Sequence, residues 1–236
     1  MKERAARDFK ELLRAGLWFR GLADDFQDAL LAAATLRRYT PGETVFTRGG
    51  PCLGLVGVLE GSIKVGGVNA QGDEAILVFA EPPTWFGEVS ILDDGPMTHD
   101  AVAERESLCI HIAPDALTRV LEKKPERWRD IGRLMAIKVR LLFTTMEEMA
   151  LLPVSALVAR RLVHMTLGYG GWDDRSARVL EVSQEQLATM LAISRQTVNT
   201  VLKDLEMQNI VRKVYAGIEI LDLPGLRAVA GKMLMP

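Results

Sequence analysis

The side chains best suited to specific chemistry lie near the C-terminal end of the chain, between residues 194 and 206. If the apolar residues of this stretch face a core, helical spacing turns five polar side chains outward: Arg195, Gln196, Asn199, Thr200 and Lys203. Arginine can pair with two atoms on the edge of guanine, and glutamine with two on the edge of adenine. Thr197 and the amino end of the helix suit a phosphate group. On an isolated helix, the same side chains would more often be ordinary solvated surface.

Two predicted helices position these side chains. Ser183 and Gln186 have the spacing of a capping box, and Ser194 can cap a second helix a few residues later. The two helices share an apolar core, which predicts a helix-turn-helix. Residues 210–215 and 218–221 predict a β-hairpin directly after it, in the position of a wing. In this setting DNA contact becomes the favoured interpretation, and Ser183 and Ser194 join the candidate contacts.

The N-terminal part of the chain has a different sequence pattern. Residues 3–34 are predicted to be helical, with Gly16 and Gly21 as interruptions. Short β-type runs separated by turns then follow at a spacing of about ten residues. The runs lie at residues 44–47, 55–59, 62–65, 75–79, around 102, and 108–111. This arrangement predicts a β-sandwich or jelly roll, so the fold class is α+β.

A long helix is predicted from about residue 125 to 152, where Pro153 ends it. Apolar side chains within it are spaced 4, 3, 4 and 3, the narrow seam of a coiled coil. They are Met135, Val139, Leu142, Met146 and Met149. We favour a parallel dimer along this seam, although packing on the chain's own β-region would also explain it. The expected domains are residues 1–124, 125–152 for the dimerisation helix, and 153–236 for the DNA-binding part.

Charge is distributed unevenly along the chain. Residues 1–122 carry 12 basic and 19 acidic side chains, a net charge of −7. Residues 123–150 have a net charge of +3, and residues 153–236 one of +2. Because the N-terminal part is acidic and the C-terminal part is mildly basic, any polyanion is expected to bind to the C-terminal part. Ordinary surface variation is an equally good explanation of so small a charge.

Several classes of protein are disfavoured by composition. Cys52 and Cys109 are far apart, which argues against a disulfide framework, a zinc site and an iron–sulfur cluster. No uncharged run approaches the ~20 residues that span a bilayer, and no secretory signal is evident, so we expect a cytoplasmic protein. A metal-dependent jelly-roll enzyme would need clustered histidines, whereas His99, His111 and His164 are scattered. We therefore expect no catalytic residue and no metal site.

Several motifs together resemble one family, the cyclic-AMP receptor protein / fumarate–nitrate reductase regulator (CRP/FNR) superfamily of bacterial transcription factors. They stand in the family's order at residues 41–43 (Pro-Gly-Glu), 58–65, 86–88 (Phe-Gly-Glu) and 182–206. The resemblance covers nearly the whole chain. It implies a cyclic-nucleotide-binding-type β-roll, a dimerisation helix and a C-terminal winged helix. It also implies a homodimer that binds palindromic promoter DNA and contacts RNA polymerase.

The departures from the family concern the effector. Gly87 and Glu88 match the family's pocket, and Glu88 is placed to accept a ribose hydroxyl. The Arg-Ser pair that holds the cyclic phosphate in cyclic-AMP binders is replaced by Thr98 and His99. Losing that charge-assisted pair costs on the order of 1.5–3 kcal/mol. The Thr-Ser pair that contacts adenine is replaced by Leu142-Phe143, which we expect to fill the site. Cyclic AMP is therefore disfavoured.

Other effectors and functions remain open from the sequence. A cyclic dinucleotide or haem could gate the same regulator, with His99 on the rim of the pocket, or the protein could have no effector. The N-terminal cysteine cluster of the fumarate–nitrate branch is absent. An interaction module without DNA binding is the alternative from another class, and the winged helix argues against it. Two departures concern DNA: Gln196 stands where many members carry glutamate, and Thr200 where a second arginine is common.

Overall fold

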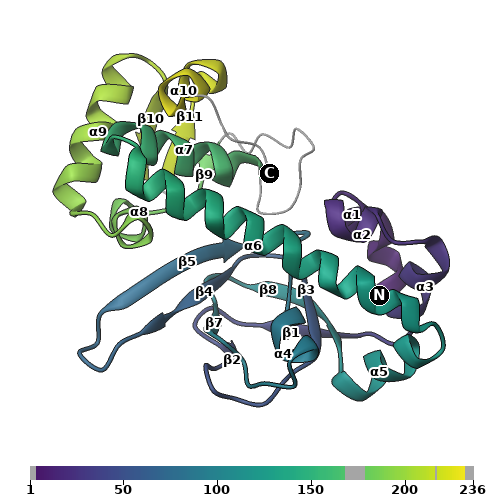
Figure 1. Cartoon of the computed structure of the whole chain (residues 1–236). Coiled ribbons are helices and arrows are strands. Elements are labelled where there is room, and N and C mark those ends of the chain that lie inside the picture. Colours follow the sequence, from purple (N-terminus) through teal and green to yellow (C-terminus); the bar gives the residue numbers. More distant parts are fainter. Residues whose placement is uncertain (1–3, 168–178, 216, 232–236) are drawn as a thin grey trace.

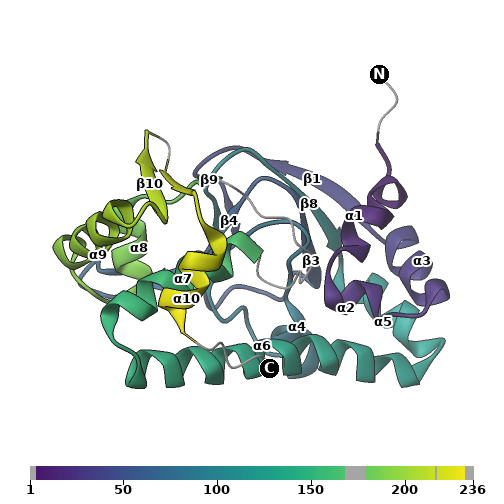
Figure 2. The same cartoon turned by 90° about the horizontal axis from the view of Figure 1, so that it is seen from above.

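The computed structural model describes residues 4–167, 179–215 and 217–231. A β-roll with short N-terminal helices forms one part, a winged helix forms another, and one long helix runs between them (Figures 1 and 2). The predicted loop at residues 168–176 lies outside the described residues.

The N-terminal segment forms four short helices, with breaks at the predicted positions Gly16 and Gly21 and a further change from 3₁₀ to α-helix after Phe9. They are η1 (Ala6–Phe9), α1 (Lys10–Arg14), α2 (Leu17–Arg20) and α3 (Asp24–Ala32). Their aromatic side chains close one end of the β-roll. The ring of Phe19 stacks on that of Trp85 with centroids 5.8 Å apart, and Trp18 meets Trp85 edge-on at 5.3 Å.

The β-roll consists of two antiparallel four-stranded sheets, which confirms the predicted α+β class. The first sheet has the order β1 (Thr35–Tyr39), β8 (Ser107–Ile112), β3 (Leu55–Glu60) and β6 (Trp85–Phe86). The second has the order β2 (Thr44–Phe46), β7 (Asp100–Ala103), β4 (Ile63–Val68) and β5 (Glu74–Ala80). Alternating apolar residues of both sheets, such as Val58, Ile63 and Ala101, face a shared interior.

One helix lies between strands of the roll, and two more lead from the roll to the C-terminal part. Helix α4 (Glu88–Leu92) follows β6, and α5 (Pro114–Glu122) follows β8. After the 3₁₀ turn η2 (Pro125–Arg127), the helix α6 (Trp128–Leu151) spans 24 residues along the side of the roll (Figure 2). The predicted long helix thus begins three residues later than expected, because its first turn is 3₁₀. Within the described part, no helix is long and apolar enough to cross a bilayer.

The C-terminal part is a winged helix. Helices α7 (Val154–Leu167), α8 (Gln184–Leu191) and α9 (Arg195–Met207) share one apolar core with the wing and with α10 (Leu223–Ala230). The wing pairs β10 (Val211–Val214) with β11 (Gly217–Ile220), and β11 also pairs with the short strand β9 (Val179–Leu180). Sequence reasoning missed β1, β6, β9, α4 and α10, all of which depend on distant partners or are very short.

Candidate DNA interface and effector pocket

Helices α8 and α9 meet at a tight turn. Ala192 ends α8 in the left-handed conformation, with φ of 53° and ψ of 39°. This residue redirects the chain so that α9 begins three residues later. Val198, Leu202 and Leu205 then face the core, each at most 2% exposed. The opposite side of α9 is consequently turned to solvent.

The predicted contact residues lie on that outer side. Arg195, Gln196, Thr200 and Lys203 are exposed, while Thr197 and Asn199 are half-buried. The Arg195 side chain is 69% exposed, and its Nε lies 3.8 Å from Glu185 on α8. A pair this exposed contributes at most about 1 kcal/mol, so it leaves the guanidinium available to a ligand.

The serine and threonine candidates already have partners in the chain. The Ser183 hydroxyl accepts from the backbone N–H of Gln186 at 3.1 Å, and the backbone N–H of Ser183 donates to Gln186 Oε1 at 2.9 Å, which completes the predicted capping box. Ser194 accepts from the N–H of Thr197 at 3.0 Å. The Thr200 hydroxyl donates to the carbonyl of Gln196 at 3.1 Å. Arginine, glutamine and lysine are therefore the side chains with the greatest reach on this surface.

The predicted effector pocket begins at Gly87, between β6 and α4. Gly87 has a φ of 104°, and a Cβ there would lie 2.0 Å from the carbonyl oxygen of Gly54, so only glycine fits. The next residue, Glu88, is 3% exposed. Its carboxylate accepts a hydrogen bond from Lys138 Nζ of α6 at 2.7 Å. Sequence reasoning missed Lys138, because residues 50 positions apart give no local signal of contact.

The interior of the roll beside this site is filled by apolar side chains. Phe46 and Phe86 meet edge-on with ring centroids 5.4 Å apart, and Met97 is 4% exposed within the same cluster. Leu142 and Phe143 are 55% and 64% exposed, so they do not fill their own β-roll as expected. They lie on the outward side of α6 instead.

Thr98 and His99 bond to each other at the rim of the roll. The Thr98 hydroxyl lies 2.9 Å from His99 Nδ1. Burial is the main cause that lowers the pKa of His99, with smaller contributions from Arg48 and Lys138, while Asp100 raises it. His111 lies apart, bonded to the Tyr39 hydroxyl at 2.9 Å, and burial lowers its pKa to about 4. Among the described residues, no cluster of histidine, cysteine and acidic side chains could hold a metal ion.

The predicted dimer seam forms one stripe along α6. Met135 is half-buried, and the other four members are exposed. Val139, Leu142, Met146 and Met149 have exposed fractions of 38, 55, 60 and 45%. Four large apolar side chains on one exposed helix face are unusual in a lone soluble chain and are typical of an interface.

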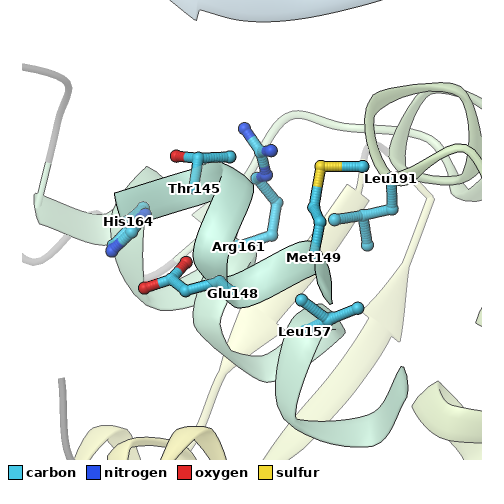
Figure 3. Close-up of a pocket in the computed structure, with 7 residues that line it drawn as sticks. All are labelled: Thr145, Glu148, Met149, Leu157, Arg161, His164 and Leu191. Atoms are coloured by element: carbon cyan, nitrogen blue, oxygen red, sulfur yellow. The ribbon is translucent and has the colours of Figure 1, made fainter. Parts of the chain in front are cut away.

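A small cavity of about 10 Å³ lies where α6 meets α7. Figure 3 shows Glu148 of α6 and His164 of α7 beside it. Arg160 of α7 pairs with Glu148 at 2.8 Å, and the two side chains are only 4% and 8% exposed. Arg160 also donates to the carbonyl of Ala230 at 2.7 Å. This buried ion pair connects α6, α7 and the end of α10; the sequence showed only charges in a mostly apolar helix.

Two family models match the chain in the order of its two main parts. A cyclic nucleotide-binding domain matches residues 36–124, and a Crp-like helix-turn-helix domain matches residues 158–229. The first therefore covers β-roll residues, and the second covers α8, α9 and the wing.

Curated relatives resemble the chain over most of its length. A CRP-like cAMP-activated global transcriptional regulator of Mycobacterium tuberculosis is 29% identical over 85% of this chain and 90% of its own. The cyclic AMP receptor protein of Thermus thermophilus is 24% identical over 90% of this chain and 95% of its own.

Solved structures share the fold. FixK2 from Bradyrhizobium japonicum superimposes with a TM-score of 0.72 at 19% identity, covering 84% of this chain and 98% of its own. The c-di-GMP responsive global regulator CLP of Xanthomonas campestris gives 0.66 at 19% identity, over 84% and 99%. At this identity the likeness concerns the fold alone.

Proposed function

The chain belongs to the CRP/FNR family of DNA-binding transcriptional regulators, and we propose that it acts as a homodimer on palindromic promoter DNA without requiring cyclic AMP. The observation that carries the DNA-binding part is the exposed start of α9, where Arg195 and Gln196 follow directly on the helix cap. Helices of this kind place their first turn against base edges in the major groove. A mobility-shift assay on DNA upstream of regulated genes tests the proposal.

We assign one role to each part of the chain. Residues 1–124 form the effector domain, residues 125–152 the dimerisation helix, and residues 153–236 the DNA-binding domain. Two-fold symmetry then requires two half-sites about 10–10.5 base pairs apart, or a multiple of that distance. Contact with RNA polymerase belongs to the same proposal.

Gln196 sets one base preference in the operator. Its amide suits the N6 and N7 atoms of adenine, whereas a glutamate would accept from the amino group of cytosine. We expect wild type and Gln196→Glu to select different bases at one position of each half-site from random DNA. All other positions should agree between the two proteins, which serves as the internal control. Identical motifs would show that Gln196 reads no base.

The exposed stripe on α6 supports the homodimer. We expect Leu142→Asp to convert the dimer to monomers, because the substitution places two like charges beside each other in an apolar seam. Light scattering at micromolar concentration measures the change. Arg140→Asp is the matched control, since Arg140 lies outside the seam on the same helix, and it should remain dimeric. A dimeric Leu142→Asp variant would contradict the seam.

Cyclic-AMP independence rests on three observations in the β-roll. Thr98 stands where a cation would be needed, Glu88 is held by Lys138, and Phe46, Phe86 and Met97 occupy the interior. A relative is named as cAMP-activated, and these residues are the reason not to transfer that property to this chain.

Calorimetry tests directly whether the protein binds cyclic AMP. We expect no binding of cyclic AMP, and DNA binding should be equal with and without it. A Kd below about 10 μM, roughly −7 kcal/mol, would contradict this expectation. A thermal-shift panel of cyclic mononucleotides, cyclic dinucleotides and haem, with and without operator DNA, then searches for another effector. A ligand that binds the native state raises its melting temperature by mass action.

A further inference from the structure

The winged helix packs directly against the outer side of its own β-roll. Figure 1 shows β5 extending from the roll to α8. Ile76 and Phe79 of β5 are 4% and 5% exposed, and both belong to the apolar core of the winged helix rather than to the interior of the roll. Two parts of the chain that are about 80 or more residues apart thus share one core.

A bulge in β5 makes this packing possible. Side chains three residues apart in a regular strand point to opposite faces. The pairing of β4 with β5 shifts register between Val65 and Gly66, so that Leu77 is an extra residue in β5. Because of the inserted residue, Ile76 and Phe79 lie on the same face of the strand.

Polar contacts surround the apolar packing. Arg105, in the turn between β7 and β8, pairs with Glu81 of the roll at 2.8 Å and with Glu181 of the winged helix. Gln186 of α8 donates to Glu104 at 2.6 Å. Gln186 is also the capping residue of α8, so the start of the helix-turn-helix is bonded to the roll. We name Ile76, Phe79, Glu81, Glu104 and Arg105, with Glu181 and Gln186, the docking contact.

The docking contact does not use the recognition surface. It involves β5, the β7–β8 turn, β9 and α8, whereas Arg195, Gln196, Thr200 and Lys203 remain exposed on α9. Docking is therefore compatible with DNA binding. It also constrains the winged helix by a second attachment, in addition to the connection from α6 to α7. A part held at two places has a defined orientation relative to the dimer axis.

We propose that the docking contact sets the distance between the two recognition helices of the dimer, so that the protein accepts only one half-site spacing. This inference rests on the proposed function. One inserted base pair moves a half-site by 3.4 Å and rotates it by about a tenth of a turn. A docked winged helix cannot follow this displacement, whereas an undocked one, attached through the α6–α7 junction, can.

Two variants break the docking contact by different means. Arg105→Gln removes both ion pairs, and Phe79→Ser removes the larger apolar anchor. Arg38→Gln is the matched control for the first, because Arg38 pairs within the roll, with Glu60 and Glu106. Val68→Ser is the control for the second, since Val68 is 58% exposed on the neighbouring strand. Thermal unfolding identifies any variant that fails to fold, and Glu104→Ala, which removes the acceptor of the Gln186 bond, then replaces it.

The experiment measures affinity for palindromes whose spacing is lengthened or shortened by one to three base pairs. Wild type and both controls should lose on the order of tenfold per change, equivalent to about 1.4 kcal/mol. For each of the two docking variants, the affinity should change by less than about threefold across the series of spacings. Docking variants that keep the wild-type profile overturn the inference, as does a wild type that accepts every spacing.

Hydrogen exchange without DNA separates this inference from the proposed function. In the DNA-free protein, amides of residues 76–80 and 184–191 should exchange on the order of tenfold faster in the docking variants than in wild type, and at the wild-type rate in the controls. Unchanged exchange overturns docking even where DNA is bound. A wild type that binds a single half-site as tightly as the palindrome instead overturns the proposed homodimeric function.

Discussion

Replacing Arg195 with alanine is expected to weaken binding to the selected operator by about 1–3 kcal/mol per half-site. The dimer loses this contribution twice, so affinity should fall roughly 30-fold or more. The physical reason is that the nearby threonines cannot replace a guanidinium bonded to two atoms of guanine: the hydroxyls of Thr197 and Thr200 are short and already bonded within the chain. The guanine preference at that position should disappear with the affinity.

Two further variants separate base reading from general attraction. Lys203→Ala, if Lys203 meets a phosphate, should weaken all sequences alike and reduce the slope of log affinity against log salt by about 1. Arg227→Ala removes an exposed cation from α10, outside the recognition helix, and should change little. Titrations of operator and scrambled DNA at several salt concentrations provide the measurement. An Arg195→Ala variant that still prefers guanine would show that another residue reads that base.

The second large effect is expected at the junction of α6 and α7. Removing either partner of the Arg160–Glu148 pair breaks a buried ion pair, and such a loss typically costs about 3–5 kcal/mol. For a chain of this size, the melting temperature of Arg160→Ala should fall by about 10 °C. Arg160→Ala also leaves the carbonyl of Ala230 without its guanidinium donor, so the end of α10 should loosen.

A double replacement isolates the electrostatic cause. Arg160→Met combined with Glu148→Met keeps the volume and removes both charges, so it should recover most of the stability lost in either single variant. Arg129→Ala changes an exposed residue of α6 and should stay within about 0.5 kcal/mol of wild type. Thermal and denaturant unfolding measure the stability of wild type and of each variant. Single variants that lose less than about 1 kcal/mol would contradict a stabilising role for the pair.

Features encoded by neighbouring residues were predictable from the sequence. The capping box of Ser183 and Gln186, the cap at Ser194 and the outward face of α9 depend on atoms three or four residues apart. Gly16 and Gly21 interrupt helices for equally local reasons. The strands around residues 55–59 and 75–79 were visible from their apolar runs. The departure at Thr98, compared with a known family motif, also needed no coordinates.

Features that depend on distant partners needed the tertiary structure. The strand β1 has three exposed residues of five and lacks an apolar run, so only its pairing with β8, some 70 residues away, identifies it. Leu142 and Phe143 were expected to fill the adenine site, but α6 leaves both side chains exposed, away from the chain's own roll. Distant partners also determine the pairs Glu88–Lys138 and Arg160–Glu148 and the docking contact.

The sequence by itself therefore determined the order of the parts, the helix-turn-helix and the chemistry of its exposed face, because helical and strand periodicity and capping are local properties. The tertiary structure alone decided what holds Glu88, what fills the β-roll and how the winged helix sits on β5. The energy of a charge or an apolar side chain depends on whether other segments bury it. Which segments do so is settled by the packing of the whole chain, and local spacing carries no record of it.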